Sequence, residues 1–196
     1  MPEPRPKIIL ASTSPYRKDL LKKLGLYFEC AAPGIDESSR LNESPQALAS
    51  RLAQEKAVAI SKHRGEGLII GSDQVAAMGD TLIGKPGSRD AAIDQLLRTS
   101  GRTVEFHTAV CVTQGETGVS RGSIDLCRVT FRSLTKEQIK SYVDADQPYD
   151  CAGSFKSEGL GIALVEKIEC NDPNTLIGLP LISLIRLLDS FGVQIP

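Results

Sequence analysis

Residues 7–25 read KIILASTSPYRKDLLKKLG, and this stretch decides the fold class. Its first five residues, Lys7–Ala11, form a short apolar run that predicts a buried strand. Ser14 and Pro15 then give a helix start, with serine as the N-cap and proline at the first helical position. Leucines at helical spacing give this helix an apolar stripe, and Gly25 ends it. A strand that leads directly into a helix is typical of α/β proteins.

The rest of the chain repeats the alternation. Residues 1–6 are expected to be an extended lead-in, and Ser44–Pro45 repeats the helix-start signal. Further helices are predicted at 89–98, 135–143 and 179–191, and further strands at 27–31, 68–78, 81–83, 103–113, 119–132 and 160–166. The strands at 103–113 and 119–132 form a long hairpin. Alternating strands and helices with one inserted hairpin predict an α/β fold with a mixed β-sheet and flanking helices.

Composition limits the class of protein. The chain has 196 residues, 41% of them hydrophobic, which suits one compact domain or two lobes that share a core. The formal net charge is −1, whereas nucleic-acid-binding proteins usually carry a basic excess, so no nucleic-acid partner is expected. The apolar run after Lys7 is too short for a signal peptide, and no stretch approaches the length of a membrane span. No membrane partner is expected either.

Cysteine usage points to a reducing compartment. The five cysteines are odd in number and no CxxC pair occurs, which argues against a disulfide framework or a structural zinc site. Reduced thiols in a cytoplasmic protein are the expectation. The positions are Cys30, Cys111, Cys127, Cys151 and Cys170.

The junction of the first strand and helix, residues 12–18, is a candidate phosphate site. Free backbone N–H groups at a helix N-terminus attract anions, and hydroxyl groups stand beside them. Arg17 and Lys18 lie in the first turn, where the helix dipole disfavours cations by roughly 0.3–1 kcal/mol. A bound phosphate relieves that conflict. The alternative is a solvated N-cap with basic residues on the surface.

Acidic residues supply candidates for a general base and a metal site. Gly71–Gln74 follows the apolar residues 68–70, and ligands in α/β sheets bind beyond the carboxyl ends of strands. Asp73 therefore suits a general base or a metal ligand, with a simple turn aspartate as the alternative. Glu37, Glu55 and Asp73 are candidate ligands of magnesium, which prefers a few carboxylate oxygens plus substrate phosphates.

Two glycine-containing segments add further candidates. Residues 79–85 fit the first part of a phosphate-binding P-loop, but Pro86 stands where a serine or threonine must hold magnesium, so the P-loop is rejected. Lys85 still suits phosphate as a point charge. The glycine-rich stretch 151–161 allows close approach to a ligand and carries Lys156 and Glu158.

Six segments, by their order and spacing, together resemble the Maf family of nucleotide pyrophosphatases from Ile8 to about Phe191. They are LASTSPYR at 10–17, QEKA at 54–57, GSDQ at 71–74, GKP at 84–86, AGSFKSEG at 152–159 and GLP at 178–180. The resemblance implies a single domain over 1–196, with an elongated α/β fold of the Maf/ITPase-like type and two lobes around a deep cleft. It also implies hydrolysis of a nucleoside triphosphate to the monophosphate and pyrophosphate, with Mg²⁺ or Mn²⁺ as cofactor.

The resemblance also implies roles for individual residues. Asp73 would accept a proton from the water that attacks the α-phosphorus. Positive charge and a metal would stabilise the leaving pyrophosphate, which is electrostatic catalysis. The residues that would hold phosphate or line the catalytic cleft are Ser12, Arg17, Glu37, Lys56 and Lys85.

Three positions resemble the family branch that acts on 7-methyl-GTP. These are Tyr16, Gln74 and Glu158, and Lys156 is a further candidate for substrate binding. N7-methylation makes the guanine ring positive, and an aromatic face attracts such a ring by up to about 2 kcal/mol when desolvated. Glu158 would accept hydrogen bonds from the guanine N1–H and N2–H groups. An unpaired polar group would then disfavour other bases.

Two other functions stay open at this point. One is a dTTP/UTP pyrophosphatase of the same family, which the residues at 16, 74 and 158 disfavour. The other is a nucleotide-binding regulator of septum formation with little turnover, although a pure binder needs no general base such as Asp73. A small nucleotide is the expected ligand in each case, and formation of a homodimer is left open.

Overall fold

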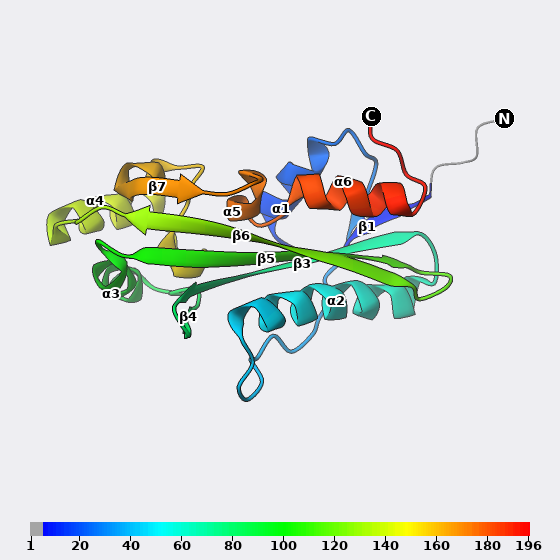
Figure 1. Ribbon diagram of the computed structural model, residues 1–196, viewed down its shortest axis with the longest axis horizontal. Helices are drawn as coiled ribbons and strands as arrows, with labels where there is room; N and C mark the ends of the chain where they lie inside the picture. The colour runs from blue at the N-terminus through cyan, green and yellow to red at the C-terminus, as the bar shows by residue number, and fades with distance from the viewer. Residues whose placement is uncertain (1–5) are drawn as a thin grey trace.

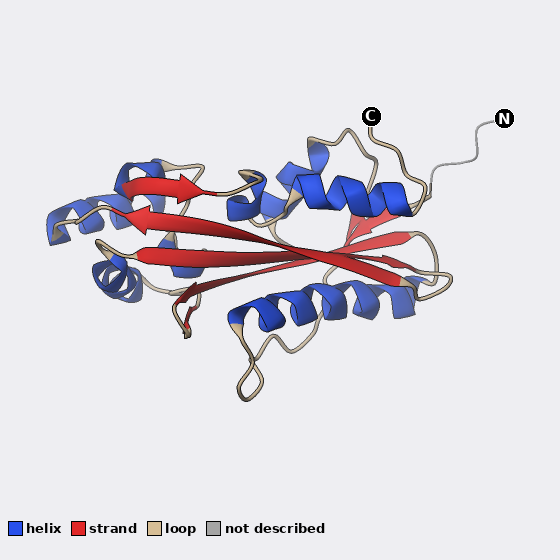
Figure 2. Ribbon diagram, in the orientation of Figure 1, coloured by secondary structure: helices blue, strands red, loops and turns tan. Residues whose placement is uncertain are grey.

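The computed structural model describes residues 6–196, and it confirms the predicted α/β fold. An elongated, mixed sheet of seven strands carries helices on both faces (Figures 1 and 2). Residues 1–5 of the expected lead-in lie outside the described part. The strands are β1 (Ile8–Leu10), β2 (Glu29–Cys30), β3 (Leu68–Met78), β4 (Thr81–Ile83), β5 (Thr103–Gln114), β6 (Ser120–Phe131) and β7 (Val165–Glu169).

The strand order is β2-β1-β3-β5-β6-β7, with β4 paired to β3. β1 is parallel to both β2 and β3, and all other pairings are antiparallel. The helices are α1 (Pro15–Lys22), α2 (Pro45–Arg64), α3 (Arg89–Thr99), α4 (Lys136–Asp146), α5 (Asn174–Ile177) and α6 (Leu181–Ser190). Helix α2 covers one face of the sheet, and α1 and α6 cover the other (Figure 1).

Both serine–proline signals mark helix starts, as predicted. Ser14 Oγ accepts a hydrogen bond from the backbone N–H of Arg17, and Ser44 Oγ accepts one from that of Ala47. Each serine thereby satisfies an N–H group that has no partner inside its helix. The chain therefore enters α1 and α2 at positions fixed by local sequence.

Strand β1 is buried on both faces, because neighbouring side chains point in opposite directions. Ile8 and Leu10 pack with the leucines of α1 and α6, whereas Ile9 and Ala11 pack against α2. A third apolar cluster, under α3 and α4, fills the far end of the molecule around Phe106. The continuous apolar run of the sequence thus reflects a strand with helices on either side.

A gap along one edge of β3 opens the sheet. β1 pairs with residues 68–70, and β4 pairs with residues 76–78 of the same edge. Residues 71–75 have no strand partner on this edge within the described chain, although β5 pairs with them on the other side. The predicted strand at 68–78 is confirmed as β3, and Asp73 therefore lies within a strand and not beyond the carboxyl end of one. The strand that ends beside it is β1.

The predicted strand at 160–166 is also wrong in its bounds. Residues 160–164 form a short 3-10 helix, and β7 begins at Val165, where it meets Phe131 of β6. Gly161 lies so close to the carbonyl of Lys156 that a Cβ atom would clash with it. This close approach favours a tight helical turn over an extended strand.

The cysteines depart from the expectation of reduced thiols. Cys127 of β6 and Cys170, just after β7, form a disulfide. Cys30, Cys111 and Cys151 are free. No local pattern signals this pair, because the two residues lie 43 positions apart and meet through the pairing of β6 with β7. Separately, none of the helices within residues 6–196 is both long and apolar enough to cross a membrane.

Candidate active site

A cleft of about 530 Å³ lies at the gap in the edge of β3. It lies between the loop that joins β1 to α1, the middle of β3, and the segment that follows β4. Eight of the residues predicted from the sequence line it. They are Ser12, Tyr16, Arg17, Glu37, Lys56, Asp73, Gln74 and Lys85.

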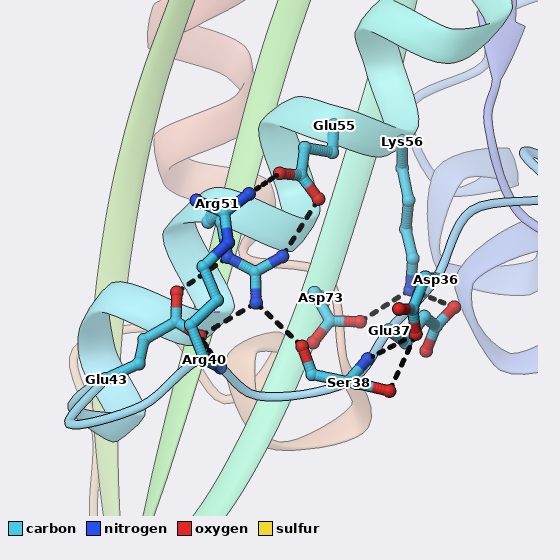
Figure 3. A network of polar contacts seen from close by, with 9 residues as sticks. All are labelled: Asp36, Glu37, Ser38, Arg40, Glu43, Arg51, Glu55, Lys56 and Asp73. Carbon is cyan, nitrogen blue, oxygen red and sulfur yellow. Dashed lines mark hydrogen bonds and ion pairs between the residues drawn. The ribbon is translucent and has the colours of Figure 1, made fainter.

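Lys56 joins two carboxylates in the cleft wall. Its Nζ donates to Asp73 Oδ1 at 2.6 Å and contacts Glu37 Oε1 at 2.8 Å (Figure 3). The Lys56 and Asp73 side chains are only 6% and 9% exposed, whereas Glu37 reaches in from an exposed loop. A buried lysine is tolerated here because paired carboxylates compensate its charge. The trio therefore places one cation and two anions at a single point.

The position of Lys56 depends on a close approach of α2 to β3. Gly71 lies against the helix backbone, where a Cβ atom would meet the carbonyl oxygen of Ala53. Because glycine has no Cβ, α2 can pack directly on the strand two residues before Asp73. This contact explains why the GSDQ segment begins with a glycine, two residues before the catalytic candidate Asp73.

The phosphate candidates lie at the start of α1. Ser12 is buried and its Oγ accepts a hydrogen bond from the N–H of Ser14. Arg17 Nε donates to the carbonyl of Gly178 at 2.9 Å, which fixes the base of the guanidinium. Burial lowers the pKa of Arg17, and the carboxylates of Asp73 and Glu37 oppose that shift. The arginine charge thus faces the same cleft as the acidic pair.

Glu55 lies apart from the other two candidate metal ligands. Its Oε1 accepts from Arg40 and its Oε2 from Arg51, both at 2.9 Å (Figure 3). No group of three histidine, cysteine or acidic residues that could hold a metal ion occurs within the described chain. The expectation that Glu55 converges with Glu37 and Asp73 is therefore wrong, because Glu55 is paired with the two arginines and does not line the cleft. The signal for this was the spacing of Arg51 and Glu55, four residues apart on one helix.

A smaller recess of about 100 Å³ continues the cleft toward Tyr16 and Glu158. The Tyr16 hydroxyl lies 4.0 Å from Cys151 Sγ, and burial, together with Cys151, Asp150 and Glu158, raises the pKa of Tyr16. Burial and Asp150 raise the pKa of the Cys151 thiol to about 12, so this side chain lines the recess as an uncharged thiol. Cys151 is the first residue of the glycine-rich stretch, whereas Asp150, the residue before it, was not predicted as part of the site.

Gln74 and Lys156 have partners within the protein. The Gln74 side-chain amide donates to Thr108 Oγ1 and to the carbonyls of Thr175 and Leu176, which leaves its Oε1 for a ligand. Lys156 Nζ donates to the backbone carbonyl of Asp146 and lines neither the cleft nor the recess. The structure thus brings Gln74 to the site and holds Lys156 away from it.

Comparisons with known proteins find similar chains along nearly the whole length. A 7-methyl-GTP pyrophosphatase from Alcanivorax borkumensis is 52% identical over the full length of both chains. One from Colwellia psychrerythraea is 50% identical over 96% of this chain and 94% of the relative. A solved structure of the Staphylococcus aureus Ham1 protein covers 95% of this chain and 97% of its own, with 12% identity and a TM-score of 0.47.

The family model for the Maf-like proteins matches residues 7–191, which is nearly the whole chain. That range contains the Lys56 trio, the start of α1 and the recess beside Tyr16. This protein therefore belongs to the Maf family.

Proposed function

We propose that this protein hydrolyses 7-methyl-GTP to 7-methyl-GMP and pyrophosphate. The observation that carries the reaction class is the contact of Lys56 with Asp73 and Glu37 in a cleft that Arg17 and Lys85 also line. Cationic groups suit a triphosphate, and a carboxylate beside them suits activation of water. The substrate is supported by relatives of the same length, which are named 7-methyl-GTP pyrophosphatase.

In the proposed reaction, a water oxygen attacks the α-phosphorus and passes its proton to Asp73. Because Lys56 donates to Oδ1 of Asp73, Oδ2 is the oxygen that accepts this proton. The bond from the α-phosphorus to the oxygen bridging the β-phosphate breaks, and its electron pair leaves with pyrophosphate. Lys56, Arg17 and Lys85 stabilise the negative charge that develops on the leaving group.

A divalent cation, Mg²⁺ or Mn²⁺, belongs to the same proposal. Glu37 and Asp73 would hold it, since Lys56 brings their oxygens to a common point in the cleft. Two carboxylates suit Mg²⁺, which takes its remaining ligands from water and substrate phosphates. When bound, the cation supplies further positive charge to the phosphates.

Base recognition is proposed for the recess beside Tyr16. The half-buried ring offers an aromatic face to the positively charged 7-methylguanine, and Glu158 lines the same recess. Asp150 adds a second carboxylate nearby. This concentration of negative charge favours a cationic base over an unmethylated one.

The test is turnover of a nucleotide panel by the purified protein with Mg²⁺ or Mn²⁺. The panel contains 7-methyl-GTP, GTP, dTTP, UTP and CTP, and the readouts are pyrophosphate released and the identity of the nucleotide product. The expected result is a strong preference for 7-methyl-GTP over the other nucleotides. EDTA should abolish the turnover, because it removes the divalent cation. Asp73→Asn protein, prepared in parallel, controls for contaminating phosphatases.

Other outcomes separate the parts of the proposal. Preference for dTTP or UTP would keep the reaction and overturn the assignment of the recess. Binding without turnover of any nucleotide would overturn the reaction itself.

A cytoplasmic location is part of the same proposal. It is supported by the free thiols of Cys30, Cys111 and Cys151, although Cys127 and Cys170 are paired.

A further inference from the structure

The loop of residues 36–43, here called the Glu37 loop, carries one partner of Lys56 on a segment without helix or strand. Its own internal support is slight. Asp36 Oδ1 accepts from the N–H and hydroxyl of Ser38, and Arg40 N donates to Glu43 Oε2. Leu41, near its tip, is 94% exposed. The placement of Glu37 must therefore depend on what ties this loop to the rest of the protein.

Arg51 of α2 supplies that tie. Its Nε donates to Glu43 Oε1 at 2.6 Å and its Nη2 donates to Glu43 Oε2 at 2.7 Å, which makes a bidentate salt bridge. The same Nη2 donates to the backbone carbonyl of Ser38 at 3.0 Å, one residue from Glu37. One guanidinium thus grips the loop near both of its ends (Figure 3).

The pair is shielded from solvent and oriented from the helix side. The Arg51 and Glu43 side chains are 14% and 9% exposed, so water screens them less than an ordinary surface pair. Arg51 Nη1 also donates to Glu55 Oε2 at 2.9 Å, one helical turn away, and Glu55 in turn accepts from Arg40. Glu55, which was predicted to be a metal ligand, therefore orients the Arg51 guanidinium.

We propose that Arg51 is the positioning residue for Glu37, and that Glu43 and Glu55 hold Arg51 in place for this task. The inference rests on the proposed function, because it assigns Arg51 a role in that reaction. Arg51 contacts neither Lys56 nor Asp73 and acts only through the loop. Its planar fork matches a carboxylate and a carbonyl at once, which the single ammonium of a lysine cannot do.

The experiment compares Arg51→Gln with a matched control, Arg89→Gln. Arg89 of α3 forms a similar bidentate salt bridge with Asp144 of α4, at 2.6 and 2.8 Å. Neither residue lines the cleft. Loosening the Glu37 loop is expected to lower kcat for 7-methyl-GTP roughly 10- to 100-fold, the cost of a small misplacement in a catalytic group. KM should change less than kcat, because Arg17, Lys85 and Tyr16 line the substrate cleft independently of this loop. Arg89→Gln should leave both constants near wild type.

Arg51→Gln leaves Glu43 as an unpaired, shielded charge, which destabilises the fold. The Arg51→Gln/Glu43→Gln variant removes both charges and serves as the second test. Circular dichroism and thermal unfolding establish that the proteins compared are folded. Arg51→Lys should recover only part of kcat, since it restores the charge without the fork. A folded double variant with wild-type kcat would overturn the proposal.

A double-mutant cycle with Glu37→Gln separates positioning from general support of the fold. If Arg51 acts through Glu37, adding Arg51→Gln to Glu37→Gln should cost less than threefold in kcat, because the group to be positioned is already lost. Full multiplication of the two losses would overturn the proposal. If the wild-type protein turns over no nucleotide, the proposed function fails before this cycle is reached, so the two failures are distinguishable.

Discussion

Asp73 gives the sharpest test of the proposed chemistry. Asp73→Asn keeps an oxygen that accepts from Lys56 but removes the group that takes the proton. Loss of a general base typically costs about 10²–10⁴-fold in rate, and kcat is expected to fall by that amount while the protein stays folded. Steady-state kinetics and thermal unfolding check this. A folded variant with near-normal kcat would remove Asp73 from the mechanism.

Tyr16 is expected to set the preference for a methylated base. Tyr16→Leu removes the aromatic face, worth up to about 2 kcal/mol or about 30-fold, and should lower the ratio of kcat/KM for 7-methyl-GTP over GTP. Tyr16→Trp should raise the same ratio, because indole binds cations more strongly. Tyr27→Leu is the control, since Tyr27 is 98% exposed and lines neither the cleft nor the recess. Equal losses on both substrates would mean that the ring does not discriminate.

The contact between α2 and β3 should tolerate no side chain at Gly71. A Cβ in Gly71→Ala would meet the backbone of Ala53 and Ala57, so the helix that carries Lys56 must shift. Overpacking of this kind costs about 1–3 kcal/mol, measurable by urea denaturation. Gly84→Ala is the matched control, because a Cβ at Gly84 has nothing within 4 Å. Equal stability of the two variants would contradict the close packing.

The tie between the Glu37 loop and α2 should weaken in acid. Hydrogen bonds from Arg51 and from the backbone of Arg40 lower the pKa of Glu43 to about 2 from its ordinary 4.5. The unfolded chain therefore takes up this proton at a higher pH than the folded chain. The stabilisation is complete above about pH 5 and is lost as the pH falls toward 2. As the pH falls through this range, the thermal unfolding midpoint should fall more steeply for the wild type than for Glu43→Gln. Parallel curves for the two proteins would show that the Arg51–Glu43 pair adds nothing to stability.

The sequence predicted elements well where the signal was local. The serine caps at Ser14 and Ser44 placed two helix starts, because a cap and its proline act within four residues. Among the cleft residues, Ser12, Arg17, Glu37, Asp73 and Lys85 were candidates from the local sequence, whereas the roles of Lys56, Tyr16 and Gln74 came from the family resemblance. Glu55 was misplaced although Arg51, four residues earlier on the same helix, is a local signal for an ion pair. Its other partner, Arg40, depends on how the loop returns to α2, which no local pattern encodes.

The cleft itself could not be derived from the sequence. It arises because β1 and β4 cover different parts of one edge of β3 and leave residues 71–75 between them. That gap depends on the lengths and registers of three strands, which long-range pairing decides. The disulfide of Cys127 and Cys170 was missed for the same reason, since strand pairing brings the two residues together.

The gap in β3 also bears on how a substrate enters. β3 and β5 pair continuously from Leu68 to Ala77, and β3 runs from the end of the molecule near α2 and α6 to the end near α3 (Figure 1). A hinge needs a few residues that absorb a large change in backbone angles, and a strand held by an unbroken ladder offers none. We therefore expect no hinge within β3 about which the two ends of the molecule close on a nucleotide. Adjustment to the substrate therefore falls to the segments of the cleft lining without helix or strand, which are the loop from β1 to α1, the segment after β4 and the Glu37 loop.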